Sequence, residues 1–113
     1  MPRDAAVFLD DIVEACRKVA SYTEGLTLND FRGDTKTLDA VVRNLEVIGE
    51  AAKKVPGDVR SQIPGVDWQR MGGLRDILIH EYFAVDVEIV WDVVQSKTED
   101  LRRRVEEFLS RPT

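Results

Sequence analysis

The segment DTKTLDAVVRNLEVIGEAAKKVPG, residues 34–57, decides the fold of this chain. Asp34 is suited to begin a helix and the Pro56-Gly57 pair to end it. Between them the apolar residues recur at spacings of three and four, which places one stripe on an α-helix: Leu38, Val41, Val42, Leu45, Ile48, Gly49, Ala52 and Val55. The opposite side carries a second apolar strip, formed by Ala40, Val47 and Ala51. That strip indicates either a partner surface or small residues tolerated at an ordinary surface.

Helical periodicity also covers the rest of the chain, whereas alternating strand patterns and hairpin turns are nearly absent. It predicts further helical segments at about Asp4–Thr23, Thr27–Phe31, one turn within Pro56–Gly65, residues 68–83 behind an Asp67 cap, and Asp86 to the end of the chain. Four long helices with short connectors predict an all-α, antiparallel four-helix bundle with short extra helical turns. We expect a single domain, 1–113.

Composition narrows the classes of function. Sixteen Lys and Arg against 21 Asp and Glu give a net charge of −5, so any nucleic-acid site must be a local patch. With one cysteine, Cys16, and one histidine, His80, an internal disulfide and a Cys/His zinc site are excluded, and we expect no metal. The longest apolar run, Ala5–Leu9, is too short for a membrane span, so we expect a soluble, cytoplasmic protein without membrane attachment.

The predicted helix 68–83 is apolar nearly all round, which is typical of a central or sandwiched helix. The polar residues among these apolar neighbours are therefore informative, because a buried charge must be paired or must face something. They are Arg75, Asp76, His80, Glu81 and Tyr82. The tandem Gly72 and Gly73 each cost about 1 kcal/mol relative to Ala inside a helix. We expect a close approach there by a helix of the bundle, a symmetry mate or a phosphate backbone.

Arg75 and His80 together suit RNA cleavage. Imidazole takes and returns a proton at neutral pH, and a guanidinium presents a forked donor to phosphate oxygens. They would support attack by a ribose 2′-hydroxyl on the adjacent phosphate without a metal. The alternative is a satisfied core histidine at His80, with Arg75 in a structural ion pair with Asp76 or a neighbouring carboxylate.

Ideal helix geometry does not decide whether the Arg75 and His80 side chains reach the same phosphate. Arg75 and His80 diverge by roughly 140° on an ideal helix, whereas Tyr82 lies on nearly the same side as Arg75 and Asp76 lies one turn below His80. Either the Arg75 side chain reaches round, or the helix ends near His80, or a second copy of the chain completes the site.

Two other features, Cys16 and a run of three arginines, are less suited to a catalytic or binding role. Cys16 lies on the apolar stripe of the first predicted helix, so we expect a core thiol rather than a nucleophile. Arg102, Arg103 and Arg104 fan over three sectors of the last predicted helix, which is typical of a solvated face that could still supply a phosphate patch.

Four strings of the sequence resemble the HepT-like family, also called DUF86, of the HEPN superfamily. They are SYTEGL at 21–26, RNLEVIGEAAK at 43–53, VDWQRMGGLRDILIHEYF at 66–83 and VDVEIVWDVV at 85–94. The HEPN pattern of an Arg, four residues, a His, one residue and a Tyr is matched by Arg75, His80 and Tyr82. The resemblance implies a helical, HEPN-type bundle that forms a homodimer.

The resemblance further implies a metal-independent endoribonuclease, the toxin of a toxin–antitoxin pair, with RNA as its substrate and no cofactor. Arg75 and His80 would be catalytic and Asp76 and Tyr82 supporting. The partner would be a nucleotidyltransferase antitoxin able to AMPylate Tyr82. Asp76 stands where Asn is more usual, and its carboxylate could raise the pKa of His80 or hold the ring. The alternative is a catalytically silent HEPN subunit that binds a nucleotidyltransferase or nucleotide.

Overall fold

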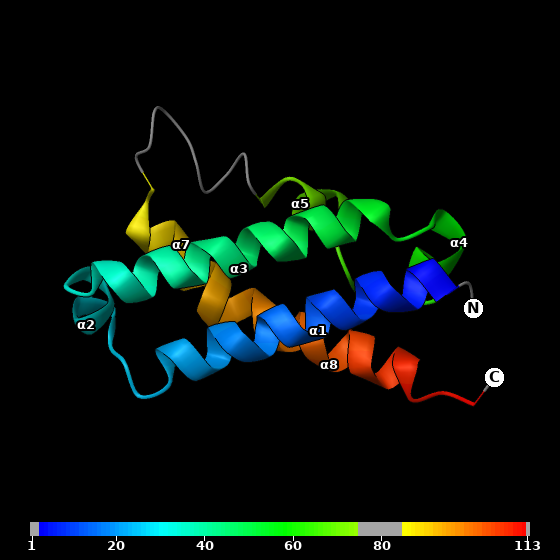
Figure 1. The fold of residues 1–113 in the computed structure, drawn as a ribbon, viewed down its shortest axis with the longest axis horizontal. Helices are drawn as coiled ribbons and strands as arrows, with labels where there is room; N and C mark the ends of the chain where they lie inside the picture. The colour runs from blue at the N-terminus through cyan, green and yellow to red at the C-terminus, as the bar shows by residue number, and fades with distance from the viewer. Residues whose placement is uncertain (1–2, 75–84, 113) are drawn as a thin grey trace.

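The structure is a computed structural model that describes residues 3–74 and 85–112, and these residues form helices and turns without a strand (Figure 1). The elements are α1 (Arg3–Thr23), α2 (Leu28–Arg32), α3 (Thr35–Lys54), α4 (Gly57–Arg60), α5 (Trp68–Gly72), α7 (Val87–Val93), the π-helical turn η1 (Val94–Thr98) and α8 (Glu99–Leu109). The predicted all-α class is confirmed. None of the helices within the described ranges combines the length and apolar character of a membrane span.

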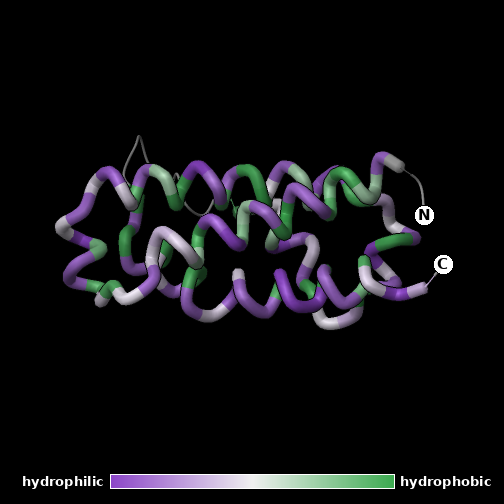
Figure 2. Tube along the Cα trace, turned by 60° about the horizontal axis from the view of Figure 1, so that its bottom comes forward, coloured by the Kyte–Doolittle hydropathy of each residue, from purple (hydrophilic) through white to green (hydrophobic). Residues whose placement is uncertain are grey.

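The long helices pack side by side, and α1 runs antiparallel to both α3 and α8. α1 and α3 form the main interface, α8 runs along α1, α5 lies against α3, and α7 lies against α2. Hydrophobic residues recur along these helices at the helical period (Figure 2). They meet in one core whose largest fully buried side chains are Phe31, Leu9, Ile12, Leu45, Ile48, Leu74, Val19, Val41, Val59, Val90 and Val105. The stripe expected on residues 34–57 supplies Val41, Leu45 and Ile48.

Helices α2, α3, α5 and α7 begin at the predicted cap residues, whose side chains accept hydrogen bonds from backbone N–H groups of the first turn. Asp34 accepts a hydrogen bond from the Thr37 backbone N–H at 3.0 Å and so satisfies one of the free donors at the start of α3. Thr27 forms a capping box with Asp30 at α2. Asp67 and Asp86 cap α5 and α7 in the same way, so these starts were predicted correctly from the sequence.

The predicted helix 68–83 is interrupted at its tandem glycines. α5 ends at Gly72, and the backbone N–H of Gly73 donates to the Gln69 and Arg70 carbonyls as a C-cap. The prediction of an unbroken helix was therefore wrong at this point, because a glycine ends a helix more readily than it continues one. Residues 75–84 lie outside the described residues.

The predicted last helix also departs from a regular α-helix. Its middle, Val94–Thr98, is a π-helical turn in which buried Thr98 donates its hydroxyl to the Val94 carbonyl at 3.0 Å. A π-helical turn brings residues five apart to the same side. Val93 and Thr98 are both buried, and Thr98 also lies four residues after buried Val94 and three before buried Leu101, so the apolar stripe continues through the turn.

Glycines allow α5 to approach α3 closely. A Cβ at Gly49 would lie 3.2 Å from the Met71 carbonyl oxygen and 3.7 Å from Leu74 Cβ. A Cβ at Gly72 would lie 3.2 Å from Lys53 Cγ. The sequence predicted that a helix of the bundle, a symmetry mate or a phosphate backbone approaches the Gly72-Gly73 pair. A helix of the bundle is confirmed for Gly72, because α3 lies against it.

The second apolar strip of α3, formed by Ala40, Val47 and Ala51, is largely buried by other residues of the same chain. Ala51 is 5% exposed, Val47 packs against the core, and Ala40 is half-buried. Phe8 and Asp11 of α1 face Val47 and Ala51 across a shallow groove. Because α1 accounts for most of this strip, its apolar character does not indicate a partner surface.

We predict that Gly49→Val lowers the free energy of unfolding by about 2 kcal/mol, because the new methyl groups would overlap the Met71 carbonyl and force α5 away from α3. Urea denaturation measures this change. Gly57→Val is the matched control, since no atom lies within 4 Å of a Cβ there, and it should change stability by no more than about 0.5 kcal/mol. Equal losses in the two variants would contradict the close approach.

Candidate functional site

The motif residues predicted from the sequence lie outside the described residues. They are Arg75, Asp76, His80, Glu81 and Tyr82. Their convergence, and the roles expected for them, therefore stay predictions. The structure does define the helices that precede and follow this segment in the chain.

Both flanks of the motif segment are anchored in the bundle. Before it, Leu74 is 2% exposed and lies against Gly49 in the second half of α3. After it, α7 begins and packs against α2: the rings of Phe31 and Trp91 have centroids 5.1 Å apart, and Arg32 forms an ion pair with Glu88. The bundle therefore fixes the positions at which the motif segment leaves and rejoins it.

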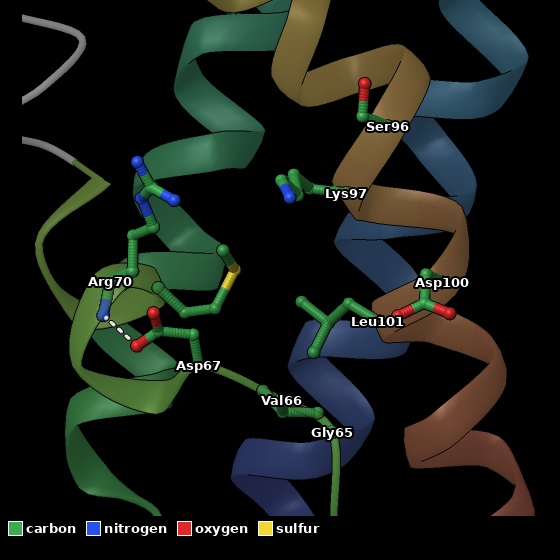
Figure 3. Close-up of a pocket in the computed structure, with 9 residues that line it drawn as sticks. Gly65, Val66, Asp67, Arg70, Ser96, Lys97, Asp100 and Leu101 are labelled. Carbon is green, nitrogen blue, oxygen red and sulfur yellow. Dashed lines mark hydrogen bonds between the residues drawn. The ribbon is translucent and has the colours of Figure 1, made fainter.

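A pocket of about 180 Å³ lies between α5 and the η1–α8 pair (Figure 3). Its apolar side is formed by the buried residues Met71 and Leu101. Arg70 from α5 and Lys97 from η1 are exposed and lie at the same end of the pocket, on facing elements. Within the described parts of the chain neither cation forms an ion pair.

The two carboxylates of this pocket, Asp67 and Asp100, already accept hydrogen bonds from other groups of the protein. Asp100 accepts hydrogen bonds from Arg104 at 2.8 Å and from Arg103 at 2.6 Å, and these guanidinium groups hold its pKa below the usual value of 3.8. The Asp67 carboxylate accepts from the backbone N–H of Arg70 at 3.1 Å as the cap of α5. Arg104 also donates to the Pro64 carbonyl at the pocket edge, so the rim is cationic on balance.

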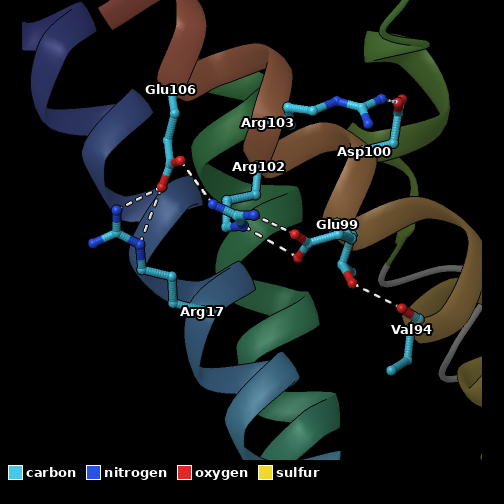
Figure 4. A network of polar contacts seen from close by, with 8 residues as sticks. Arg17, Val94, Glu99, Asp100, Arg102, Arg103 and Glu106 are labelled. Carbon is cyan, nitrogen blue, oxygen red and sulfur yellow. Dashed lines mark hydrogen bonds and ion pairs between the residues drawn. The ribbon is translucent and has the colours of Figure 1, made fainter. Parts of the chain in front are cut away.

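The arginine run of α8 forms an ion-pair network instead of an open phosphate patch (Figure 4). Arg102 pairs with Glu99 and, at 2.7 Å, with Glu106, and Arg17 of α1 pairs with the same Glu106 at 2.6 Å. The hydrogen bonds from Arg102 and Arg17 hold the pKa of Glu99 and Glu106 respectively below 4.5. Since Arg103 and Arg104 also pair with Asp100, each arginine of the run already has an acidic partner.

Cys16 is a core residue, as predicted. It is 1% exposed, and burial raises the pKa of its thiol to about 12. A thiol with that pKa stays protonated near neutral pH and is a poor nucleophile. Cys16 therefore contributes packing rather than chemistry.

Arg60 has a structural role that the sequence did not reveal. Its guanidinium donates to the carbonyls of Ala52 at 2.8 Å, Lys53 at 3.1 Å and Val55 at 2.9 Å, and so caps the C-terminus of α3. The same group lies over the Trp68 ring at 5.9 Å from its centroid. An arginine in a connector gives no periodic signal, so only the folded arrangement shows what it binds.

The pocket that contains Arg70 and Lys97 was also not predicted from the sequence. It joins two segments that are 27 positions apart and that belong to different helical patterns. Asn44, within the motif string of α3, has a local role, because its amide donates to the Ala40 carbonyl at 2.9 Å.

The fold defines the class of protein. Over 98% of this chain and 100% of the other, the structure superposes with a TM-score of 0.71 on a tri-AMPylated HEPN toxin of Shewanella oneidensis solved in complex with an MNT antitoxin. The sequences are 20% identical, so this likeness concerns the fold alone. The described helices thus form a HEPN-type bundle, as expected.

The chain belongs to the ribonuclease HepT-like family, whose pattern matches residues 12–108. A protein of Methanocaldococcus jannaschii named "Putative RNase" is 43% identical over 96% of this chain and 91% of its own length. A protein of Thermococcus cleftensis named "Probable ribonuclease HepT" is 39% identical over 96% of this chain and 98% of its own length. The resemblance to the HepT-like family is confirmed, and the enzyme class expected from it, a ribonuclease, is the class of this family.

The ion pairs of α8 predict how stability depends on pH. The folded state holds the pKa of Glu99, Asp100 and Glu106 below their unfolded values, so their contribution is fully present above about pH 4.5 and is lost as pH falls through the folded pKa values. We predict that Arg104→Gln lowers stability at pH 7 by about 0.5 kcal/mol, an amount typical of exposed pairs, and that the difference shrinks at pH 3.

Urea denaturation at both pH values measures this effect. Lys97→Gln is the control, since Lys97 is exposed and has no ion pair in the described residues, and it should change stability at neither pH. An Arg104→Gln deficit that is the same at pH 7 and pH 3 would contradict the role of Asp100.

Proposed function

We propose that this protein is a metal-independent endoribonuclease and the toxin of a toxin–antitoxin pair. The observation that carries the proposal is membership of the ribonuclease HepT-like family together with the spacing of Arg75, His80 and Tyr82. The anchored flanks of the motif segment support it, because a catalytic segment needs a fixed frame.

The proposed chemistry is an internal transfer at a phosphodiester. His80 takes the proton of the ribose 2′-hydroxyl, the 2′-oxygen bonds to the adjacent phosphorus, and the bond from phosphorus to the 5′-oxygen breaks. The leaving 5′-oxygen takes a proton, which leaves a 2′,3′-cyclic phosphate and a 5′-hydroxyl. Arg75 stabilises the extra negative charge on the phosphate oxygens in the transition state. Asp76 would hold the His80 ring and favour its protonated form.

We propose that the active enzyme is a homodimer. Arg75 and His80 diverge by roughly 140° on an ideal helix, so a second copy of the chain can supply the group that a single helix directs away from the reacting phosphate. Light scattering that shows a dimer at micromolar concentration would support this assembly, whereas a monomer that cleaves RNA at full rate would reject it.

A nucleotidyltransferase antitoxin is the proposed partner. The HEPN toxin with the same fold is tri-AMPylated and was solved with an MNT antitoxin, which supports a partner of that class for this chain. Tyr82 is the proposed acceptor, because it follows His80 by two residues and lies on the same side of an ideal helix as Arg75.

A catalytically silent binding subunit is the second candidate. The net charge of −5 favours it, since this charge opposes general attraction to RNA. The complete set of Arg75, His80 and Tyr82 favours the enzyme instead. Toxicity on expression of the chain without a partner, compared with His80→Ala, separates the two candidates.

We predict that His80→Ala and Arg75→Ala each reduce RNA cleavage at least about 100-fold, because they remove the general base and the charge-stabilising group. Cleavage by the unaltered protein should continue in EDTA and yield a 2′,3′-cyclic phosphate end. Gel assays with end-group analysis measure both results. Lys18→Gln, an exposed position on α1, is the control that should leave cleavage unchanged. Loss of activity in EDTA would reject the metal-independent mechanism.

We predict that co-expression with the cognate nucleotidyltransferase places adenylyl groups on Tyr82 and inhibits cleavage. Each added phosphate would bring negative charge to the entry of a site that must receive RNA. Intact-mass and peptide mass spectrometry locate the modification, and Tyr82→Phe should lose it. A fully neutralised complex in which Tyr82 is unmodified would show that binding of the partner is sufficient.

A further inference from the structure

We propose that the pocket between α5 and the η1–α8 pair binds one phosphate-bearing unit of the RNA strand, held by Arg70 and Lys97. This inference deepens the proposed ribonuclease function and rests on it, because it assigns a substrate-binding subsite outside the catalytic motif. Arg70 lies five residues before Arg75 in the chain, so the pocket and the motif are close in sequence.

The charges of the pocket favour a polyanion. Arg70 and Lys97 lie at the same end of the pocket and form no ion pair within residues 3–74 and 85–112. Asp100 is neutralised by Arg103 and Arg104, and the Asp67 carboxylate is engaged at the start of α5. A protein with a net charge of −5 needs a local cationic patch to bind RNA, and this pocket provides one.

The size and floor of the pocket indicate part of a polymer rather than a whole small molecule. Its volume of about 180 Å³ is well below the roughly 300 Å³ at which complete small-molecule sites begin. Met71 and Leu101 give it an apolar side, and the polarisable thioether of a methionine packs well against a flat ring. A phosphate with part of its nucleoside meets both requirements, with the phosphate at the cations and the apolar part toward Met71.

The groove between α1 and α3 fits RNA less well. It carries Asp11, Glu46 and Glu50 against Arg43 and Lys54, and Glu50 already pairs with Lys53, which leaves two carboxylates against two cations. The groove therefore offers a polyanion no net positive charge.

In two further cavities of the described residues, no lysine or arginine of the lining is left without a partner. The one beside α5 contains Arg60, whose guanidinium is committed to α3 carbonyls, and Lys53, which pairs with Glu50 at 3.4 Å. The one between the end of α1 and η1 has Glu24 and Glu99 and no lysine or arginine in its lining. Of the four cavities compared, the Arg70–Lys97 pocket is therefore the best phosphate site.

The test is binding of a fluorescently labelled, single-stranded 2′-O-methyl RNA, measured by anisotropy over a range of salt concentrations. The blocked 2′-oxygen prevents the proposed cleavage, so binding is measured independently of the His80 assignment. We expect the double variant Arg70→Gln/Lys97→Gln to bind about tenfold more weakly. Its logarithmic salt dependence should become shallower by about 0.7 for each phosphate that the variant no longer neutralises.

The control double variant Lys18→Gln/Lys36→Gln makes the same change in net charge at exposed positions outside the pocket and should bind like the unaltered chain. Arg70→Lys/Lys97→Arg keeps both charges and should retain most of the affinity and the salt dependence. Equal weakening in the pocket and control variants would overturn the inference, because binding would then follow net charge alone.

Cleavage of ordinary RNA separates this inference from the proposed function. If both hold, Arg70→Gln/Lys97→Gln raises KM with kcat nearly unchanged, since the pocket binds outside the reacting bond. Cleavage with an unchanged KM, together with unchanged binding, would reject the pocket and keep the ribonuclease. Pocket-dependent binding by a chain that cleaves no RNA would reject the ribonuclease and keep the pocket.

Discussion

The close contact between α5 and α3 is the constraint on which the rest of this structure depends. It is a backbone contact made at Gly49, where an added Cβ would lie 3.2 Å from the Met71 carbonyl oxygen and would force that backbone to move by a few tenths of an ångström. The contact positions Leu74, the last described residue before the proposed catalytic motif, and it also sets the position of Arg70. A glycine on the face of one helix thus connects core packing to the place where chemistry is proposed.

Much of this arrangement could be predicted from the sequence, because helical periodicity and cap chemistry are local. Asp34, Asp67 and Asp86 identify helix starts without knowledge of the fold, and the motif spacing led to the correct family. The interruption at Gly73 and the π-helical turn were missed because the same spacing of apolar residues suits a regular helix and a locally distorted one. The pocket was missed because it depends on tertiary packing.

The distribution of charge explains how an acidic protein can have a nucleic-acid site. Most arginines of α8 are paired with carboxylates on the same helix, and Arg17 ties that helix to α1. These pairs stabilise the bundle and remove their charges from general attraction to RNA. Arg70 and Lys97, which form no ion pair in the described residues, lie together on one side, so a modest local field can select where the strand binds.

The π-helical turn at Val94–Thr98 also bears on how this chain can change in evolution. In helical register such a turn equals one inserted residue, so the segments before and after it belong to two different registers. Deletion of one residue there would allow a regular α-helix, and α7 and α8 would keep their faces toward the core because the turn absorbs the extra residue. The pairing of Arg102 and Glu106 with Arg17 would survive such a deletion, whereas residues within η1, Lys97 among them, would shift relative to Arg70. A change of length by one residue at η1 would therefore alter the pocket and leave the core and the ion pairs in place.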